Sequence, residues 1–183
     1  MLPDLSAMLG FRIPPSSDLL VTAGVALHHR TDAVFHETRA FVELSRWARV
    51  ELSASGMSRG PARALAHIGT EILLDEQLGQ DPPTEGAYLD ALRTAASAAE
   101  GQNSIETSRI RNLAQRLVER GIARSLEPEL VARRLRHALE SHPRLRFGET
   151  EEPIVTRWVV NARPRVAART DELLVELRGR LDP

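Results

Sequence analysis

Apolar side chains recur every three or four residues along most of this 183-residue chain. The spacing is clearest in two segments, at Phe41, Leu44, Trp47 and Leu52 and at Leu65, Ile68, Ile72 and Leu73. An α-helix places residues at this spacing on one face, which can pack against a core. No stretch of useful length alternates between apolar and polar residues as a β-strand does. The sequence therefore predicts an all-α fold, a single-domain bundle of seven or eight helices over residues 1–183.

Proline, glycine and capping residues divide the chain into the expected helices. These cover about residues 18–29, 32–54, 60–78, 84–99, 105–120, 125–141 and 152–181, after a short apolar element over residues 1–9. The first two can be one helix or two, because Thr31 and Asp32 can form an internal cap. Pro164 is expected to kink or split the last helix, because proline lacks the N–H that an inner turn needs.

A polar stripe runs along the segment 23–36, which is otherwise rich in alanine, valine and leucine. His28, Asp32 and His36 are four residues apart, so a helix stacks them on one face. Imidazole and carboxylate groups beside a core are typical metal ligands. At a rise of 1.5 Å per residue the stripe is about 12 Å long, so one ion cannot bind all three side chains. The ordinary alternative is a hydrogen-bonded histidine at the core edge, an aspartate cap and a surface histidine.

The segment 60–78 repeats the same pattern with His67, Glu71 and Asp75. The surrounding sequence is apolar, and burying an unpaired carboxylate there would cost several kcal/mol unless a metal or an arginine offset it. Gly69 would allow another group to approach this helix closely. Asp75 is expected at the surface, and His67 with Glu71 can also be a plain pair on a helix surface.

Composition limits the possible metals and partners. The chain has no cysteine, so a metal site must use histidine and carboxylate ligands, which favour manganese, iron or zinc. A formal net charge of −1 argues against a nucleic-acid-binding protein held by counterion release. Every basic residue apart from histidine is arginine. Arginine suits phosphate groups, and the ordinary alternative is a coding bias of the genome toward arginine over lysine. No apolar run is long enough to span a membrane, and we expect a cytoplasmic protein.

Three short motifs resemble those of the acyl carrier protein phosphodiesterase family. Residues 2–5 (Leu-Pro-Asp-Leu) are similar to the family's early Leu-Ala-Asp-Phe, residues 23–32 to its Ala-Gly-Ile followed by His-Arg-x-Ile-Asp, and residues 137–145 to its C-terminal Arg-x-Pro-x-Leu stretch. Two places depart from the family pattern. Residues 67–73 stand where the family has Asp-x-x-x-Asp-His-Phe, and His36 stands where it has an acid.

The resemblance implies a small helical hydrolase with an arrangement like that of HD-type phosphohydrolases. Proteins of this family use a metal to remove the phosphopantetheine arm from holo acyl carrier protein. The resemblance therefore implies phosphodiesterase activity, an acyl carrier protein as partner, and a ligand role for Asp4 in the early motif.

Together these observations predict a metal-dependent hydrolase of a phosphate ester. The predicted metal ligands are Asp4, His28, Asp32, His67 and Glu71. His36 is predicted to be a further ligand or the proton donor to the leaving group, and a nearby arginine would neutralise charge on the phosphoryl group. Two alternatives stay open. One is a non-catalytic helical protein that binds an acidic partner through its arginines, and the other is a di-iron redox enzyme.

Overall fold

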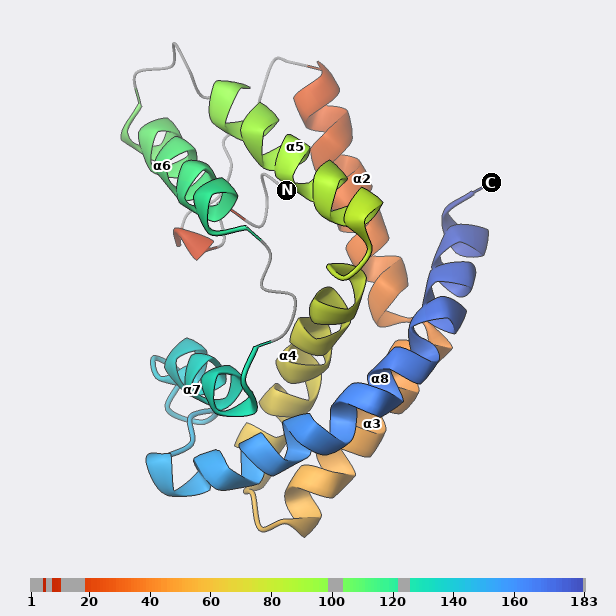
Figure 1. Cartoon of the computed structure of the whole chain (residues 1–183), viewed down its shortest axis with the longest axis vertical. Helices are drawn as coiled ribbons and strands as arrows, with labels where there is room; N and C mark the ends of the chain where they lie inside the picture. The colour runs from red at the N-terminus through yellow and green to blue at the C-terminus, as the bar shows by residue number, and fades with distance from the viewer. Residues whose placement is uncertain (1–4, 6–7, 11–18, 99–103, 122–125, 183) are drawn as a thin grey trace. The chain divides into compact units, whose positions relative to one another are not determined.

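A computed structural model describes residues 5, 8–10, 19–98, 104–121 and 126–182 of the chain (Figure 1). Over these ranges the protein contains helices and no strand, which confirms the all-α prediction. The helices are α2 (Leu19–His36), α3 (Arg39–Ala54), α4 (Arg59–Leu78), α5 (Pro82–Ala98), α6 (Ile105–Arg120), α7 (Pro128–Leu139), the 3-10 helix η1 (Glu149–Glu151) and α8 (Glu152–Leu181). None of these helices is both long enough and apolar enough to cross a membrane.

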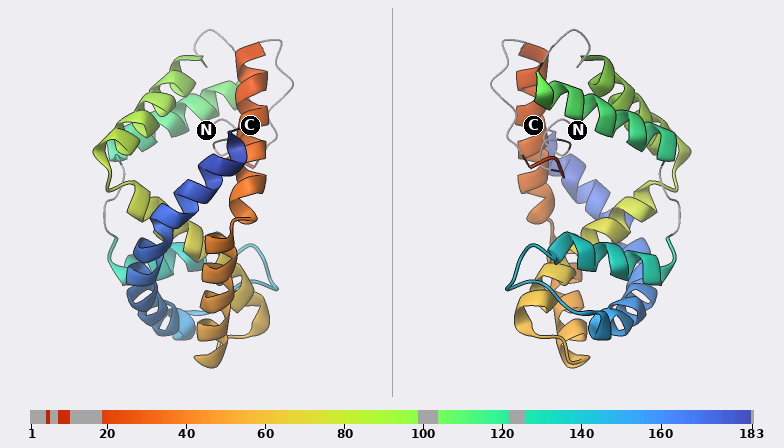
Figure 2. Two further views of the ribbon diagram at one scale, coloured as in Figure 1. Left: turned by 90° about the vertical axis from the view of Figure 1, so that its right-hand side faces the viewer. Right: turned by 90° about the vertical axis from the view of Figure 1, so that its left-hand side faces the viewer.

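The chain divides into two compact units. Residues 1–33 and 79–123 form the first, and residues 34–78 and 124–183 form the second. Within the first unit α5 packs against α6, and within the second α3, α4 and α8 pack against one another, with α7 against α8 (Figure 2). The single domain over residues 1–183 and its HD-like arrangement stay predictions.

The first unit has a small core between α5 and α6. Its buried residues include Leu92 of α5 and Ala114 of α6, together with Leu5. Ser104 caps α6, because its hydroxyl accepts a hydrogen bond from the Thr107 N–H. The helix ends at Gly121, whose positive φ of 66° suits glycine. The predicted bounds of this helix are therefore confirmed.

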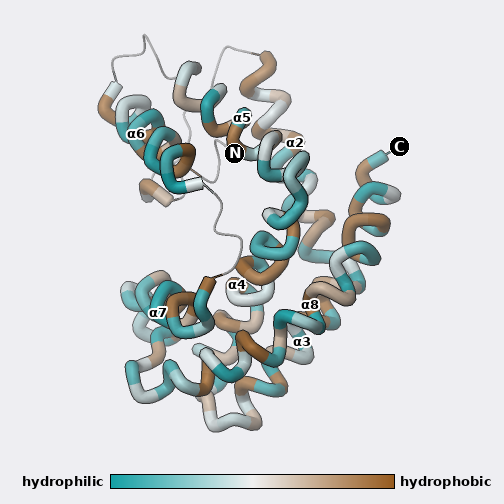
Figure 3. Tube along the Cα trace, in the orientation of Figure 1, coloured by the Kyte–Doolittle hydropathy of each residue, from teal (hydrophilic) through white to brown (hydrophobic). Residues whose placement is uncertain are grey.

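The second unit holds the larger core, which the predicted apolar faces supply. Its buried residues include Phe41, Leu44 and Leu52 of α3, Leu65 and Leu73 of α4, and Val155, Trp158 and Val159 of α8. Trp47, Ile68 and Ile72 pack at its edge. Figure 3 shows hydrophobic and hydrophilic residues interspersed along these helices, as expected when one face of each helix is buried.

Gly69 lets α8 approach α4 closely. A Cβ atom at this position would lie 2.6 Å from the indole of Trp158, which is closer than side chains pack. The predicted close approach at Gly69 is confirmed, and the group that approaches is a buried tryptophan.

The break between the first two long helices falls later than the sequence predicted. α2 continues through Thr31 and Asp32 to His36, and α3 begins after Thr38. The Thr38 side chain accepts a hydrogen bond from the Phe41 N–H, and its hydroxyl donates to the Phe35 carbonyl. Thr38 is fully buried, so this cap joins both helix ends to the core, whereas Asp32 is exposed. The boundary predicted at residues 31–32 was wrong.

Replacing Thr38 by Ala is expected to lower the free energy of unfolding by about 1 kcal/mol, because it removes the α3 cap and one of the two hydrogen bonds that the Phe35 carbonyl accepts. Urea denaturation would measure the change. Thr38→Ser keeps the hydroxyl and should recover most of the loss. Equal effects of the two variants would show that the cap contributes nothing.

Pro164 lies inside α8 and does not split it into two helices. The ribbon of α8 curves along its length (Figure 1). A proline removes one hydrogen bond of the inner turn, and packing of Val159, Ala162 and Val166 into the core holds the helix together on both sides. Of the two effects expected of Pro164, a kink or a split, the split does not occur.

Candidate metal centre

The last turn of α2 and one face of α4 bring three potential metal ligands together within the second unit. His36 is the last residue of α2, just before the Thr38 cap. His67 and Glu71 lie one turn apart on α4, so they share one face of that helix. Within the described ranges these three residues form the group of histidine and acidic side chains that can hold a metal ion, and their ligand atoms all lie within 4.8 Å of one another.

Both imidazoles are directed at the same carboxylate oxygen. His36 Nε2 lies 2.8 Å from Glu71 Oε1, and His67 Nε2 lies 3.3 Å from that oxygen. For a tetrahedral zinc with bond lengths near 2.0 Å, neighbouring ligand atoms are separated by about 3.3 Å. The two nitrogen-to-oxygen distances are therefore close to those of a metal site, and small side-chain shifts would admit an ion.

Aromatic contacts fix the planes of the two imidazoles. The rings of His36 and His67 stack at a centroid distance of 4.8 Å with an interplanar angle of 10°. The buried Phe41 ring meets both edge-on, at 5.1 Å from His36 and 5.3 Å from His67. This packing limits the rotamers of the histidines and so pre-organises the cluster, which we call the His36–His67–Glu71 centre.

The centre is half-buried. The side chains of His36 and Glu71 are 28% and 32% exposed, and that of His67 is 49% exposed. Three protein ligands with access to solvent are typical of catalytic zinc sites, which keep one position for water or substrate. Without a metal, the same groups can act as a hydrogen-bonded acid and base pair.

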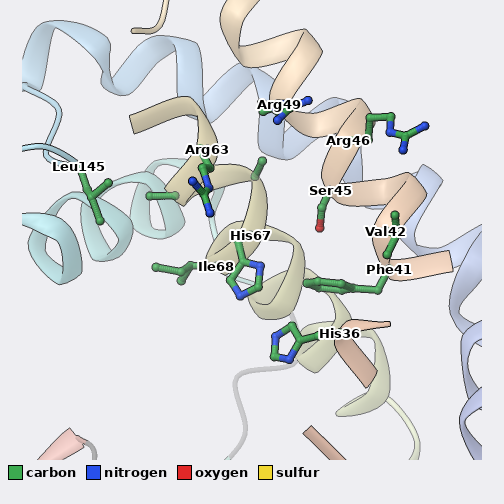
Figure 4. Close-up of a pocket in the computed structure, with 12 residues that line it drawn as sticks. His36, Phe41, Val42, Ser45, Arg46, Arg49, Arg63, His67, Ile68 and Leu145 are labelled. Atoms are coloured by element: carbon green, nitrogen blue, oxygen red, sulfur yellow. The ribbon is translucent and has the colours of Figure 1, made fainter. Parts of the chain in front are cut away.

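A cavity of about 680 Å³ adjoins the two histidines. It is lined by His36, Phe41, Val42, Ser45, Arg46, Arg49, Arg63, Ala64, Ala66, His67, Ile68 and Leu145. Figure 4 shows Arg63 extending into the space beside His67, with the Ser45 hydroxyl facing that space from α3, whereas Arg46 points away from His67.

The pairing of α3 with α4 sets the order of residues along the cavity. These helices pack against each other and are joined by the short connection 55–58, so they run in opposite directions. Phe41 faces His67. One turn toward the connection, Ser45 on α3 and Arg63 on α4 come next. The cavity therefore has an end with the potential metal ligands and, next to it, a cationic wall that contains Arg49 and Arg63.

The arginines of the cavity differ from two arginines of the second unit that are paired with acids. Arg169 is bound to Glu43, and Arg163 to the buried Glu76. In the part of the chain that the structure describes, Arg46, Arg49 and Arg63 have no carboxylate partner. They line the same cavity, so their charges add there and favour an anion.

The structure unites part of the predicted ligand set. It brings His67 and Glu71 together with His36, and it places Asp75 at the surface as predicted. The group does not include His28 and Asp32, which precede His36 on α2 and belong to the first unit. Their roles stay predictions, and Asp4 lies outside the described residues.

No specific arginine was predicted from the sequence to belong to the site. Arg63 stands four residues before His67, so helical spacing placed it one turn from a predicted ligand. Ser45 and Arg49 gave no such signal, because their position beside Arg63 depends on how α3 pairs with α4.

Comparisons with protein-family models, curated proteins and solved structures gave no match. The resemblance to the acyl carrier protein phosphodiesterase family, which the motifs at residues 2–5, 23–32 and 137–145 indicate, stays a prediction.

Proposed function

We propose that this protein is a metal-dependent hydrolase of a phosphate ester. One observation carries the proposal. A compact group of two imidazoles and a carboxylate lies at the edge of a cavity whose wall holds arginines without carboxylate partners among the described residues. The first feature suits a divalent cation and the second suits a phosphoryl group.

In this proposal His36, His67 and Glu71 hold one divalent ion, for which manganese, iron and zinc are the candidates. When bound, such an ion supplies a water molecule of lowered pKa and polarises a phosphoryl oxygen. Arg63 binds the phosphoryl oxygens that face the cavity and stabilises the charge that develops on them. Phe41 excludes water from one side of the imidazoles and keeps them oriented.

The geometry favours a ligand role for His36 over the role of proton donor. Its Nε2 atom is directed at the same Glu71 oxygen as that of His67, so both nitrogens converge on one point. A single carboxylate in this group also supports a mononuclear site, because di-iron proteins use several carboxylates from paired helices. The non-catalytic alternative, in which the arginines bind an acidic partner, is decided by the assay below.

The test is hydrolysis by tag-free protein that is first stripped with EDTA and then given manganese, iron(II) or zinc. The substrates are p-nitrophenyl phosphate, bis(p-nitrophenyl) phosphate and holo acyl carrier protein, so that monoesterase and diesterase activities are separated. At least one metal should restore hydrolysis of one of these esters. No hydrolysis with any of the three metals would contradict the proposal and favour the non-catalytic alternative.

Arg63→Gln should lower kcat/KM by about a hundredfold, because one positioned donor to developing charge contributes on that order. Arg133→Gln is the matched control. Arg133 is an exposed arginine of α7 that has no carboxylate partner in the described structure and does not line the cavity. An equal loss in both variants would point to a general effect of charge.

A further inference from the structure

We propose that the cavity beside the His36–His67–Glu71 centre recognises two linked phosphoryl groups, so that the substrate carries a diphosphate. This inference rests on the proposed function and names its substrate class. It depends on the order of side chains along α3, on the number of cationic groups in the cavity, and on a buried hydroxyl.

Two arginines of the cavity are placed to contact different phosphoryl groups. Arg63 lies one turn from His67 on α4, and a phosphoryl group beside the metal centre would contact it. Arg49 lies one turn beyond Ser45 on α3 and lines the same cavity. Residues four apart on a helix have Cβ atoms about 6 Å apart, a distance that a flexible arginine side chain easily spans. Arg49 can therefore contact a second phosphoryl group while Arg63 contacts the first.

The cavity also carries positive charge. Arg49 and Arg63 line the cavity with no described carboxylate partner, and Arg46, which points away from His67, adds a third positive charge at the cavity margin. One phosphoryl group carries at most two negative charges, whereas a diphosphate supplies more negative charge and more terminal oxygens. Arginine forks bind phosphate oxygens in a bidentate manner, so two phosphoryl groups use the available donors more fully than one.

The Ser45 hydroxyl can also contact the substrate. Its Oγ atom is buried and has no hydrogen-bond partner in the described structure. Buried polar atoms normally have partners, and this hydroxyl faces the space beside Arg63 (Figure 4). Ser45 stands between Phe41 and Arg49 along α3, so it can donate to an oxygen of a bound diphosphate.

The opposite wall of the cavity is apolar. Ile68 and Leu145 line it on the side of His67 away from Ser45 (Figure 4). This separation places the phosphoryl groups along α3 and leaves the apolar wall for the organic part of the substrate. Recognition of the diphosphate therefore does not need the metal, and it can be measured in its absence.

The experiment is calorimetric titration of the full chain, stripped of metal and dialysed free of EDTA, with inorganic pyrophosphate and with inorganic phosphate. Pyrophosphate should bind at least tenfold more tightly than phosphate, which corresponds to about 1.4 kcal/mol. Arg49→Gln should weaken pyrophosphate binding at least tenfold and change the affinity for phosphate less than twofold. Arg133→Gln should change neither affinity.

Equal affinities for the two anions, or a full pyrophosphate affinity in Arg49→Gln, would overturn the inference. Citrate is the control for simple charge attraction and should bind no better than phosphate. Citrate binding as tight as that of pyrophosphate would also overturn it. If pyrophosphate binds as expected and no ester is hydrolysed, the proposed function fails alone. If an ester is hydrolysed and pyrophosphate binds like phosphate, this inference fails alone.

Discussion

Glu71→Gln is expected to weaken zinc binding by at least about a hundredfold and to abolish metal-dependent hydrolysis. Glu71 supplies the oxygen on which both imidazoles converge, and the amide that replaces it is a neutral and much weaker ligand. Loss of a residue that merely supports a ligand already costs 10-fold to 100-fold in metal affinity or activity, so loss of a direct ligand should cost more. Competition with a chromophoric chelator measures the affinity.

The matched control is Glu51→Gln. Glu51 is an exposed acid of α3 with no ion pair in the described structure, so the variant makes the same change in net charge away from the centre. It should bind zinc like the parent protein. Thermal unfolding of metal-free Glu71→Gln should also stay close to that of the parent, because Glu71 is 32% exposed. Unchanged zinc affinity in folded Glu71→Gln would show that Glu71 is not a metal ligand.

Gly69→Ala is expected to lower the free energy of unfolding by about 2–3 kcal/mol. The new methyl group would lie 2.6 Å from the buried Trp158 indole, and extra atoms in a packed core cost energy in this range. Helix propensity alone would favour the alanine by about 0.5–1 kcal/mol, so steric strain has to exceed that gain. Urea denaturation gives the change.

Gly86→Ala provides the matched comparison. Gly86 lies in α5, and a Cβ atom there would meet nothing within 4 Å. The same substitution should therefore leave stability unchanged or raise it by up to about 1 kcal/mol. In a Trp158→Leu background, Gly69→Ala should cost less stability than it does in the parent protein, because the smaller side chain makes room for the methyl group. A neutral Gly69→Ala would show that α4 and α8 pack less closely than the structure describes.

Much of the fold was predictable because apolar periodicity is local information. The buried faces of α3 and α4 follow directly from the spacing of their leucines. The break after α2 was misplaced because Thr31, Asp32 and Thr38 are all capping residues. Burial decided among them, since Thr38 packs under both helix ends. Burial of a single side chain depends on the tertiary fold, which local sequence does not specify.

In the candidate centre too, spacing within one helix was predictable from the sequence, whereas contacts between helices were not. His67 and Glu71 are neighbours on one helix, so their spacing alone placed them together. His36 was the least defined member of the predicted site, because it stands where the resembled family has an acid. Its partner Glu71 lies on another helix, thirty-five residues away in the chain. The cationic wall was not predictable, since Ser45 and Arg49 meet Arg63 only through the pairing of α3 with α4.

The most direct measurement is the metal content of tag-free protein, followed by anomalous diffraction at the absorption edge of the metal found. We expect about one equivalent of zinc, manganese or iron per chain, with the ion bound by His36, His67 and Glu71. An ion bound elsewhere would contradict the proposed metal centre. A metal content below about 0.2 equivalents, together with no thermal stabilisation when metal is added, would contradict it as well.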